Sequence, residues 1–499
     1  MKKKKTLIIV IIAALVLAGV MVLLIFLPKG SSDNEAATID EGAAMKNSTD
    51  KAGMHQAVVE TKPNGEIKNN SYGTLIDNVP ADIKSIHVEN KKGTLDVSAN
   101  TPKGEATVYT LKGFEDYSLQ TGIPDQVANA AANLKFTKVV SADGSKKSEF
   151  GLDKPRATVT VTYVDKTTAK FIVGSDAPQE AGTYVQFGTE PTIYLCDSET
   201  VSAFDLGVND FMDLNINDAA ENTENNEASS ITISGSGFSG EIVLEPNKSD
   251  KNSASFLITS PSKGYANESE SSIISGGIRG LYADSVELVN PSSDQLKKLG
   301  LSDPHAKITA VYPDETIKLI GAKPGSDGKV YIMKDGGTIV YKISADKVAW
   351  TDTSYEKLVS DYVINPKMSS LTGVSVKTDK TFDFVLNTET STKTDDEGEE
   401  TTTTTTTVKY DGKEVDLGKF TTYYDDLSLI KLADVKSKSY SGSPEITVTY
   451  TYDDDSADTA EFYPAGNEYY IAVLNGEAAG SCYKADVVRI KNNISGVIK

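Results

Sequence analysis

The chain has 499 residues, of which 71 are acidic and 50 are basic, so its formal net charge is −21. An acidic surface of this kind repels phosphate backbones and anionic lipid headgroups, which argues against nucleic acid as a partner. At roughly 100 to 200 residues per domain, the length predicts about three domains.

The first 29 residues predict a membrane anchor. Residues 2–5 are all lysine, an uninterrupted apolar run covers residues 7–27, and Pro-Lys-Gly follows at residues 28–30. A helix over this run would span roughly 31 Å, the thickness of the hydrocarbon core of a bilayer. The lysine cluster before the run predicts a single-pass protein of the cell membrane with a cytoplasmic N-terminus and an extracytoplasmic bulk. Without the five positive charges of residues 1–29, the chain's −21 becomes −26 for the exported part.

Two other kinds of N-terminus were weighed against this signal-anchor. A signal peptide processed near residue 30 is the alternative, although its apolar region would be about 7 to 15 residues long. A lipoprotein needs a cysteine just after the apolar run, and the two cysteines are Cys196 and Cys482. Residues 30–80 are rich in Asp, Asn, Ser, Lys and Ala and predict a flexible polar stalk with a reach of roughly 40 Å.

The rest of the sequence contains one pattern three times. In the first two copies Gly-Leu-x-x-Pro precedes an alternating strand, a short acidic turn and a second strand that ends in glycine. The third copy has Gly442-Ser443-Pro444 without the Gly-Leu pair but keeps the strand and the acidic turn, and in all three a tyrosine lies eight residues after the proline. Glycine permits an unusual backbone angle, leucine can fill a core position, and proline starts an edge strand where no amide donor is needed. We therefore predict structural roles for Gly151, Leu152, Pro155, Tyr163 and Gly174 in the first copy, Gly300, Leu301, Pro304, Tyr312 and Gly321 in the second, and Pro444 and Tyr452 in the third.

Apolar periodicity extends the pattern in both directions. Hairpin-like pairs of runs follow the second strand, and a short helical stripe and two further strands precede the motif in each copy. The stripes are Val127, Ala131 and Leu134; Ile274, Ile278 and Leu281; and Phe420, Tyr424 and Leu427. The predicted fold is α+β: one N-terminal transmembrane helix and three tandem repeats, each a mostly antiparallel β meander with one short covering helix.

Polar stretches set the predicted domain boundaries. The first repeat covers residues 81–215, the second residues 228–367 and the third residues 368–499. An insertion at residues 387–408 combines an acidic stretch with seven consecutive threonines, which predicts an extended hairpin arm with a mobile acidic tip. A binding role for this arm is the alternative.

Candidate catalytic, metal and cofactor residues are not predicted. The three histidines, His55, His87 and His305, are scattered, and His305 occupies the position of Arg156 and Glu445 in the other copies, as expected of an exposed and interchangeable site. Zinc binding and histidine-based catalysis need several such groups together. No P-loop, dinucleotide fingerprint or nucleophile elbow is present.

The two cysteines of an exported protein suggest a disulfide. Cys196 and Cys482 occupy equivalent positions in the first and third copies, however, and the second copy has Ile343 there. Free cysteine behaves as a small apolar residue. We therefore predict buried core positions and no bridge.

The Gly-Leu-Asp/Ser-x-Pro motif, the strand ending in Ile/Val-Gly, the Tyr-Val hairpin and the preceding helix together resemble the bacterial family catalogued as domain of unknown function 4340. The resemblance covers roughly residues 81–499 and is weakest in the third copy, which lacks Gly-Leu. It implies a membrane-anchored exported protein, in some cases associated with auxiliary components of gliding-motility-type ABC transporters. It implies no catalytic residues.

Two functional hypotheses follow. The first is a non-enzymatic, membrane-tethered extracytoplasmic protein that acts through protein contacts, as an accessory of an ABC-type transporter or of an envelope assembly. The alternative is a module that binds a cell-envelope glycan or peptidoglycan, with stacking residues among Tyr423, Tyr424, Tyr450, Tyr469 and Tyr470. A hydrolase whose site is assembled from different repeats has no positive support in the sequence.

Overall fold

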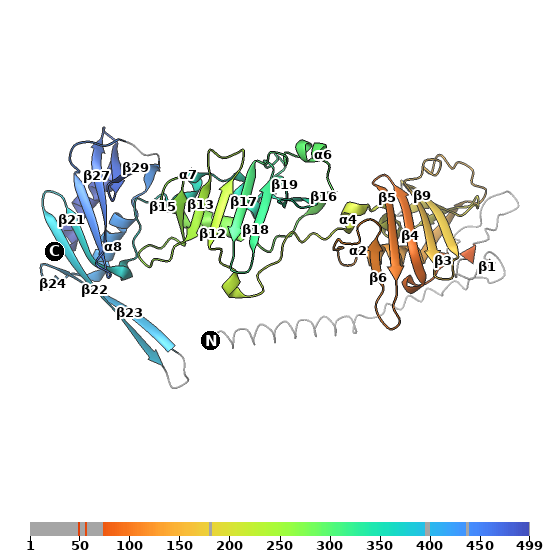
Figure 1. Ribbon diagram of the computed structural model, residues 1–499, viewed down its shortest axis with the longest axis horizontal. Coiled ribbons are helices and arrows are strands. Elements are labelled where there is room, and N and C mark those ends of the chain that lie inside the picture. The colour runs from red at the N-terminus through yellow and green to blue at the C-terminus, as the bar shows by residue number, and fades with distance from the viewer. Residues whose placement is uncertain are drawn as a thin grey trace. The chain divides into compact units, whose positions relative to one another are not determined.

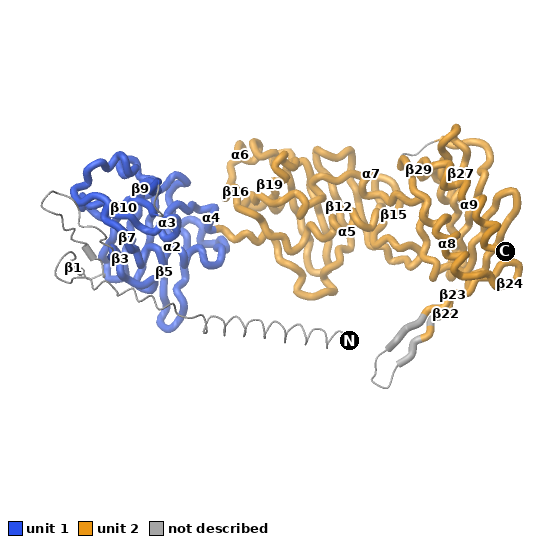
Figure 2. The backbone as a smooth tube through the Cα atoms, turned by 180° about the vertical axis from the view of Figure 1, so that it is seen from behind, with its two compact units in different colours: residues 1–211 blue, residues 212–499 orange. Residues whose placement is uncertain are grey.

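The computed structural model describes residues 73–178, 182–394, 400–435 and 439–498, together with the paired strands β1 (Ser48–Thr49) and β2 (His55–Gln56). The side chains of residues 390, 392–394 and 400–403 are also outside the description. The predicted anchor at residues 7–27 lies outside the described residues, and no helix within them is long and apolar enough to cross a membrane. Figure 2 shows the two compact units, residues 1–211 and 212–499.

The described chain forms three nine-stranded antiparallel sheets, one in the first unit and two in the second (Figure 1). The predicted α+β class with three tandem antiparallel repeats is confirmed at this level. Apolar residues alternate along the central strands, so that one face of each sheet is buried. In β8, for example, Ala157, Val159, Val161 and Tyr163 are buried on one side.

The first sheet has the strand order β3-β7-β11-β10-β9-β8-β4-β5-β6. The bounds are β3 Gly73–Asp77, β4 Ile83–Asn90, β5 Gly93–Asn100, β6 Val108–Leu111, β7 Asn133–Ser141, β8 Ala157–Tyr163, β9 Thr168–Asp176, β10 Thr183–Phe187 and β11 Ile193–Cys196.

The second sheet has the strand order β15-β14-β13-β12-β17-β18-β19-β20-β16. The bounds are β12 Ser230–Ser234, β13 Ile242–Pro246, β14 Phe256–Ser260, β15 Gly264–Tyr265, β16 Ser285–Val289, β17 Ala306–Val311, β18 Thr316–Gly321, β19 Lys329–Lys334 and β20 Ile339–Ser344.

The third sheet has the strand order β24-β23-β22-β21-β26-β27-β28-β29-β25. The bounds are β21 Leu371–Lys377, β22 Thr381–Thr394, β23 Glu400–Tyr410, β24 Lys413–Glu414, β25 Leu432–Asp434, β26 Ile446–Tyr452, β27 Ala457–Ala465, β28 Tyr469–Leu474 and β29 Glu477–Tyr483.

Eight strands occupy equivalent places in all three sheets. In chain order they are three strands that run outward from the centre, one strand on the opposite side, and a four-stranded meander that returns from the centre to that strand. The strand on the opposite side is β7, β16 or β25; it forms the edge in the second and third sheets, whereas β3 lies outside β7 in the first. A helix lies between the third strand and this strand along the chain, which requires the chain to cross the sheet. The sequence analysis did not predict β7, β16 and β25 or the third strands β6 and β14, while the third strand β23 falls largely within the predicted hairpin arm.

Two helical segments accompany each sheet, where the sequence predicted one covering helix. The crossing helices are α2 Ile123–Ala132, α5 Glu268–Gly276 and α8 Leu417–Ser428. The second segments follow the last meander strand: α3 Ser198–Ser202 and α4 Val208–Phe211; a 3-10 turn at Ala345–Asp352 and α7 Tyr355–Leu358; and α9 Lys484–Val497. The remaining helix, α6 Ser293–Lys298, lies before the motif of the second copy.

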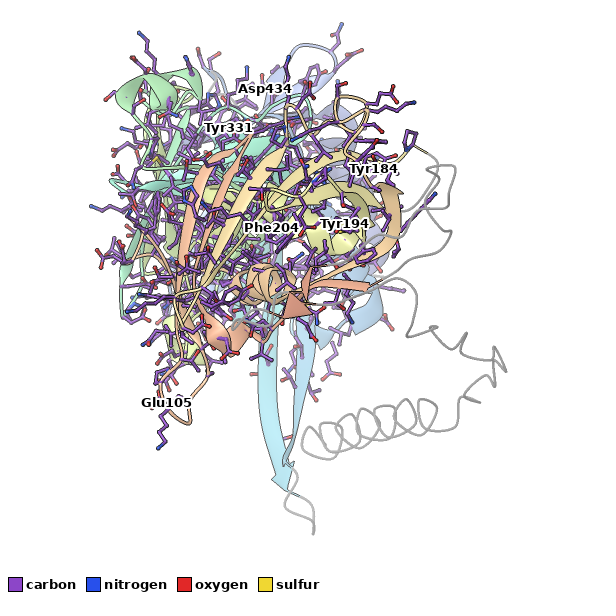
Figure 3. The ribbon with its side chains drawn as sticks, turned by 90° about the vertical axis from the view of Figure 1, so that its right-hand side faces the viewer. Glu105, Tyr184, Tyr194, Phe204, Tyr331 and Asp434 are labelled. Carbon is purple, nitrogen blue, oxygen red and sulfur yellow. The ribbon has the colours of Figure 1, made fainter. Side chains whose placement is uncertain are left out.

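The buried side of the first sheet illustrates how these segments pack. Tyr194 and Phe204, labelled in Figure 3, are fully buried there. The ring of Tyr194 lies 4.8 Å from that of Phe136 on β7, and Phe204 lies edge-on to Phe171 of β9 at 5.1 Å between centroids. In the second sheet the indole of Trp350 donates a hydrogen bond to the Gly277 carbonyl at 2.8 Å.

The structure shortens two of the predicted helical stripes. Leu134 lies on β7, and Ile278 and Leu281 follow the end of α5. All three are nevertheless buried. Apolar periodicity does not show where a helix ends when the segment that follows it is buried in the same core.

The first two predicted repeats, from residues 81 and 228, begin later in the chain than the segments that pair with their sheets. β3 falls inside the predicted stalk, yet it pairs with β7 and buries Leu75 and Ile76. Residues 212–217 likewise hydrogen-bond to the second repeat, where the Ile216 amide donates to the Leu281 carbonyl at 2.9 Å. These lead-in segments are polar and short, so composition assigns them to linkers.

The insertion at residues 387–408 forms a hairpin arm. β22 and β23 pair continuously from Phe384 and Tyr410 to Thr394 and Glu400. Beyond Val385 the outer edge of β22 has no partner strand among the described residues. The predicted acidic tip falls mostly at residues 395–399, outside the described residues.

Candidate functional site

The Gly-Leu-x-x-Pro motif builds a small apolar cluster on the sheet face opposite the main core. Leu301 is buried there with Ile320, Ala322, Met333 and Val340. In the first copy Leu152 is buried against Gly174, where an added Cβ would lie 3.0 Å from the Leu152 side chain and 2.2 Å from the Phe150 carbonyl oxygen. Gly151 and Gly300 have φ values of +71° and +74°, which explains glycine at these turns.

Each motif proline lies just before the strand. Arg156 and Glu445, which follow Pro155 and Pro444, donate backbone hydrogen bonds to Val173 and Phe462 at 2.8 and 2.9 Å. Pro304 is buried, and the other two prolines are half-buried. A proline here therefore interrupts no hydrogen bond of the ladder.

The three repeated tyrosines are buried at the end of the following strand, each with a different partner. The Tyr163 hydroxyl donates to the Ala131 carbonyl at 3.4 Å. The guanidinium of Arg279 lies 4.9 Å above the Tyr312 ring, and the Tyr452 hydroxyl donates to Asp458 at 2.7 Å. The structure thus places these tyrosines in the packing of the sheets.

The strand register corrects one equivalence. Ala157 pairs with Val173, whereas Ala306 pairs with Gly321. Gly174 is therefore equivalent to Ala322, and Gly321 lies one position earlier. An added Cβ at Gly321 would meet Thr351 at 2.8 Å and Trp350 at 3.2 Å, so this glycine serves the main core, while Gly174 serves the outer cluster.

The histidines do not come together. His87 hydrogen-bonds to Asp96 at 2.6 Å and to Glu89 at 3.4 Å, and the bond to Asp96 is the main reason that the pKa of His87 is raised. His305 is half-buried, and its ring lies over Gly237, where an added Cβ would come within 2.6 Å of three ring atoms. The position is therefore not the freely exposed one that the sequence predicted. Among the described residues, no group of three or more His, Cys, Asp or Glu side chains could hold a metal ion.

Both cysteines are free and buried. Cys196, Cys482 and the equivalent Ile343 all have 0 % exposed surface, as the repeat register predicted. Burial raises the pKa of the Cys482 thiol to about 12, with a smaller contribution from Asp486. Neither thiol is placed for nucleophilic chemistry.

The tyrosines named for glycan stacking are mostly core residues. Tyr423, Tyr424, Tyr450 and Tyr470 have 5 % or less of their surface exposed. Tyr469 is exposed, but its ring lies against that of Tyr483, with 5.4 Å between ring centroids. Tyr423 and Tyr424 lie on helix α8, and Tyr450 and Tyr470 lie on strands β26 and β28. Because these four side chains are buried, the residues do not form a stacking platform.

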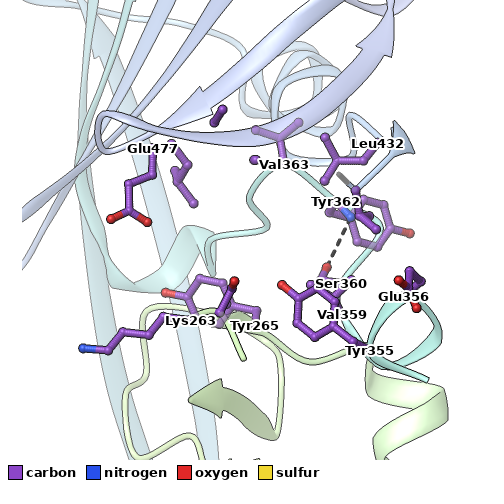
Figure 4. Close-up of a pocket in the computed structure, with 16 residues that line it drawn as sticks. Lys263, Tyr265, Tyr355, Glu356, Val359, Ser360, Tyr362, Val363, Leu432 and Glu477 are labelled. Atoms are coloured by element: carbon purple, nitrogen blue, oxygen red, sulfur yellow. Dashed lines mark hydrogen bonds between the residues drawn. The ribbon is translucent and has the colours of Figure 1, made fainter. Parts of the chain in front are cut away.

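A cavity of about 580 Å³ lies in the second unit, where residues 355–366 lead from the second sheet to the third (Figure 4). Tyrosines line the side of the second sheet and the linker: Tyr265 on β15, Tyr355 on α7, and Tyr362. Aliphatic residues line the side of the third sheet, namely Val363, Leu432, Val435 and Leu474. A concave, largely apolar site with a few polar groups is typical of a binding site.

The linker that forms the cavity is hydrogen-bonded to both sheets. The Ser360 amide donates to the Tyr265 carbonyl at 2.8 Å, and the Val363 amide donates to the Ile430 carbonyl at 2.9 Å. Nearby, the Lys251 amine pairs with Asp454 at 2.7 Å and lies 5.0 Å from the centre of the Tyr452 ring. Backbone hydrogen bonds therefore hold the linker to both sheets, and one ion pair nearby joins the second repeat to the third.

Charged residues stand at the mouth of the cavity. Lys263, Glu356 and Glu477 line it and are exposed, and none of them forms an ion pair within the part of the chain that the structure describes. Inside, Ser360 accepts a hydrogen bond from the Tyr362 amide at 3.2 Å (Figure 4). Burial raises the pKa of Tyr265 and Tyr355, so both phenols are neutral donors at physiological pH.

No pattern in the sequence indicated this cavity. Its tyrosines come from a β-hairpin, a one-turn helix and a linker, and their spacing follows no periodicity. Ser354-x-x-Lys357 resembles a catalytic motif, but the Ser354 hydroxyl accepts a hydrogen bond from the Lys357 amide at 3.3 Å and so caps α7.

Comparison with known families finds a family model that matches the chain in two places. The family described as Domain of unknown function (DUF4340) matches residues 110–272 and 257–454. Both matches begin in the third strand of a repeat, β6 or β14, and continue into the next repeat. No curated protein and no solved structure matches the chain. Since the two family matches together cover well over half of its residues, the chain belongs to the Domain of unknown function (DUF4340) family.

Proposed function

We propose that the chain is a non-enzymatic, single-pass membrane protein whose three repeats stand outside the cytoplasm and act through protein contacts. The partner would be an ABC-type transporter or another envelope assembly. The observation that carries the proposal is the N-terminal sequence, in which four lysines precede an apolar run at residues 7–27. That arrangement is typical of a signal-anchor with a cytoplasmic N-terminus.

The architecture of the second unit supports a contact role. Its two sheets are joined by a hydrogen-bonded linker, and the cavity beside that linker combines aromatic and aliphatic walls with exposed charges. An apolar centre with a polar rim is the usual anatomy of a protein interface. The buried cysteines and tyrosines add no competing chemistry, because their pKa values are raised by burial.

Two measurements test the proposal. External protease added to intact cells should digest a C-terminal tag on the full chain, while an N-terminal tag stays protected until the membrane is opened. Chemical crosslinking in cells, followed by purification of the full chain from solubilised membranes, should enrich a transporter permease or another envelope protein. A protected C-terminal tag, or the absence of any enriched membrane protein, would contradict the proposal.

A further inference from the structure

The cavity has two chemically different walls, and this difference restricts what it can hold. Tyr265 and Tyr355 present half-buried rings on one side, and Leu432 and Leu474 present half-buried aliphatic groups on the other, where Tyr362 lies beside Leu432 (Figure 4). An apolar side chain entering between them would contact carbon on both sides and displace water. A volume of about 580 Å³ is within the range that holds a compact ligand or a few side chains.

The mouth of the cavity favours positive charge. Two carboxylates, Glu356 and Glu477, and one amine, Lys263, line the cavity and are exposed, and the structure describes no ion pair for any of them. Asp458 lies near Tyr265 and adds to the negative potential. The chain as a whole has a net charge of −21, which attracts cationic partners over long distances.

We propose that this cavity is the docking site for a peptide segment of the partner protein, in which a large apolar side chain is flanked by Lys or Arg. The apolar side chain fills the space between the tyrosine and leucine walls, and the flanking cations meet Glu477 and Glu356 at the mouth. This proposal rests on the contact function proposed above and names the surface that performs it.

The structure offers a substitution that fills the cavity without strain. Gly264 lines it, and an added Cβ there would meet only the Val359 side chain, at 3.7 Å. Gly264→Phe therefore places a ring in the cavity. Gly240, on the exposed turn before β13, has no atom within 4 Å of an added Cβ, so Gly240→Phe is the matched control.

A second pair of variants tests the charge. Glu477→Lys reverses the sign of an exposed group at the mouth, and Glu241→Lys makes the same change at an exposed position away from the cavity. Because Glu477 is exposed and unpaired among the described residues, its replacement leaves the packing of the third sheet unchanged. This variant decides the question if Gly264→Phe does not fold.

The experiment pans a phage-displayed heptapeptide library against the full chain in detergent and then measures the affinity of the enriched peptides by fluorescence polarisation. We expect sequences with a central large apolar residue between Lys or Arg residues. Gly264→Phe and Glu477→Lys should each weaken binding by about tenfold or more, as expected for a central anchor and a facing charge. Gly240→Phe and Glu241→Lys should change it by less than about twofold.

Several results would overturn the proposal. They are the absence of enriched peptides, enrichment of acidic or fully polar peptides, equal affinity for Gly264→Phe and the parent chain, and binding of an N-acetylglucosamine tetramer that Gly264→Phe abolishes. The crosslinking experiment in cells separates this outcome from failure of the contact function. If the parent chain and Gly264→Phe enrich the same membrane partner equally, the contact function stands and the cavity is not its site.

Discussion

The second and third repeats fill the same space on the outer face of their sheets with different residues. In the second repeat Leu301, from the motif, packs over Ala322. In the third repeat the position of that leucine is Ser441, and Tyr463, equivalent to Ala322, fills the space with Ile471 and Val473. The ring of Tyr440 packs against that of Tyr463 at a tilt of 45°, with 4.7 Å between centroids. Both arrangements fill the same space on the outer face of the sheet. A leucine in the motif is needed where the facing residue on the neighbouring strand is small, as Ala322 is, and is not needed where that residue is large, as Tyr463 is.

The largest expected effect on stability comes from replacing the residues of the second-repeat cluster with those of the third. Leu301→Ala should destabilise the second unit by about 3 kcal/mol, because it leaves a cavity in a small cluster. Ala322→Tyr should cost about 2 kcal/mol through overpacking against Leu301. The double variant Leu301→Ser with Ala322→Tyr should cost less than the sum by at least about 1 kcal/mol.

Guanidinium unfolding followed by the fluorescence of Trp350 measures this exchange. Trp350 is the single tryptophan of the chain and is buried in the second repeat, so it reports on this region. Strict additivity of the two changes would show that Leu301 and Ala322 do not compete for one volume.

The first repeat provides a sharper test of the same space. Gly174→Ala should destabilise the first sheet by about 2 kcal/mol, because its Cβ would lie 2.2 Å from the Phe150 carbonyl oxygen. Faster hydrogen exchange of the β8 and β9 amides would report the loss. Gly373→Ala on β21, where the nearest atom lies 3.6 Å from the added Cβ, is the control and should stay within about 0.5 kcal/mol. Equal effects at both glycines would contradict the packing difference.

Substitutions in the tyrosine pair of the third repeat should reduce stability less. Tyr440→Ala should cost about 1 kcal/mol, because Tyr440 is partly exposed and loses one ring contact. Tyr440→Phe keeps the ring and loses only the hydrogen bond from the hydroxyl to the Gly476 carbonyl, 2.9 Å long. That variant should cost about 0.5 kcal/mol. Thermal unfolding of both variants, with the exposed Tyr282→Ala as control, would rank them, and the opposite order would reject stacking as the main contribution.

The smallest expected effect concerns pH at the first sheet. The pKa of His87 is raised above 6.5, mainly by its hydrogen bond to Asp96. A raised folded-state pKa stabilises the fold below pH 6.5, and this contribution disappears as the pH rises through the higher folded-state value. An NMR titration should show the shift, which Asp96→Asn should remove and Glu89→Gln should reduce less, since its bond is 3.4 Å long. A larger effect of Glu89→Gln would contradict this order.

The comparison between repeats also explains what could be predicted. The motif positions and the central strands followed from the sequence, because apolar and polar residues alternate strongly where one face is buried, as in β8, β12 and β26. Strand β7 could not be predicted, because it begins at Asn133, directly after α2 ends at Ala132. The equivalence of Gly174 and Gly321 failed for a related reason, since the two hairpins differ by one residue in their turns.

The class of the fold, the threefold repetition, and the equivalent buried positions of Cys196, Ile343 and Cys482 could be inferred from the amino-acid sequence. These features depend on local periodicity and on spacing within one repeat. The burial of individual tyrosines, the pairing of the lead-in segments and the position of the cavity depend on long-range packing and became visible in the three-dimensional structure. Tyr265, Tyr355 and Tyr362 meet around one space because a linker is hydrogen-bonded between two sheets, and such long-range contacts leave no periodic trace in the chain.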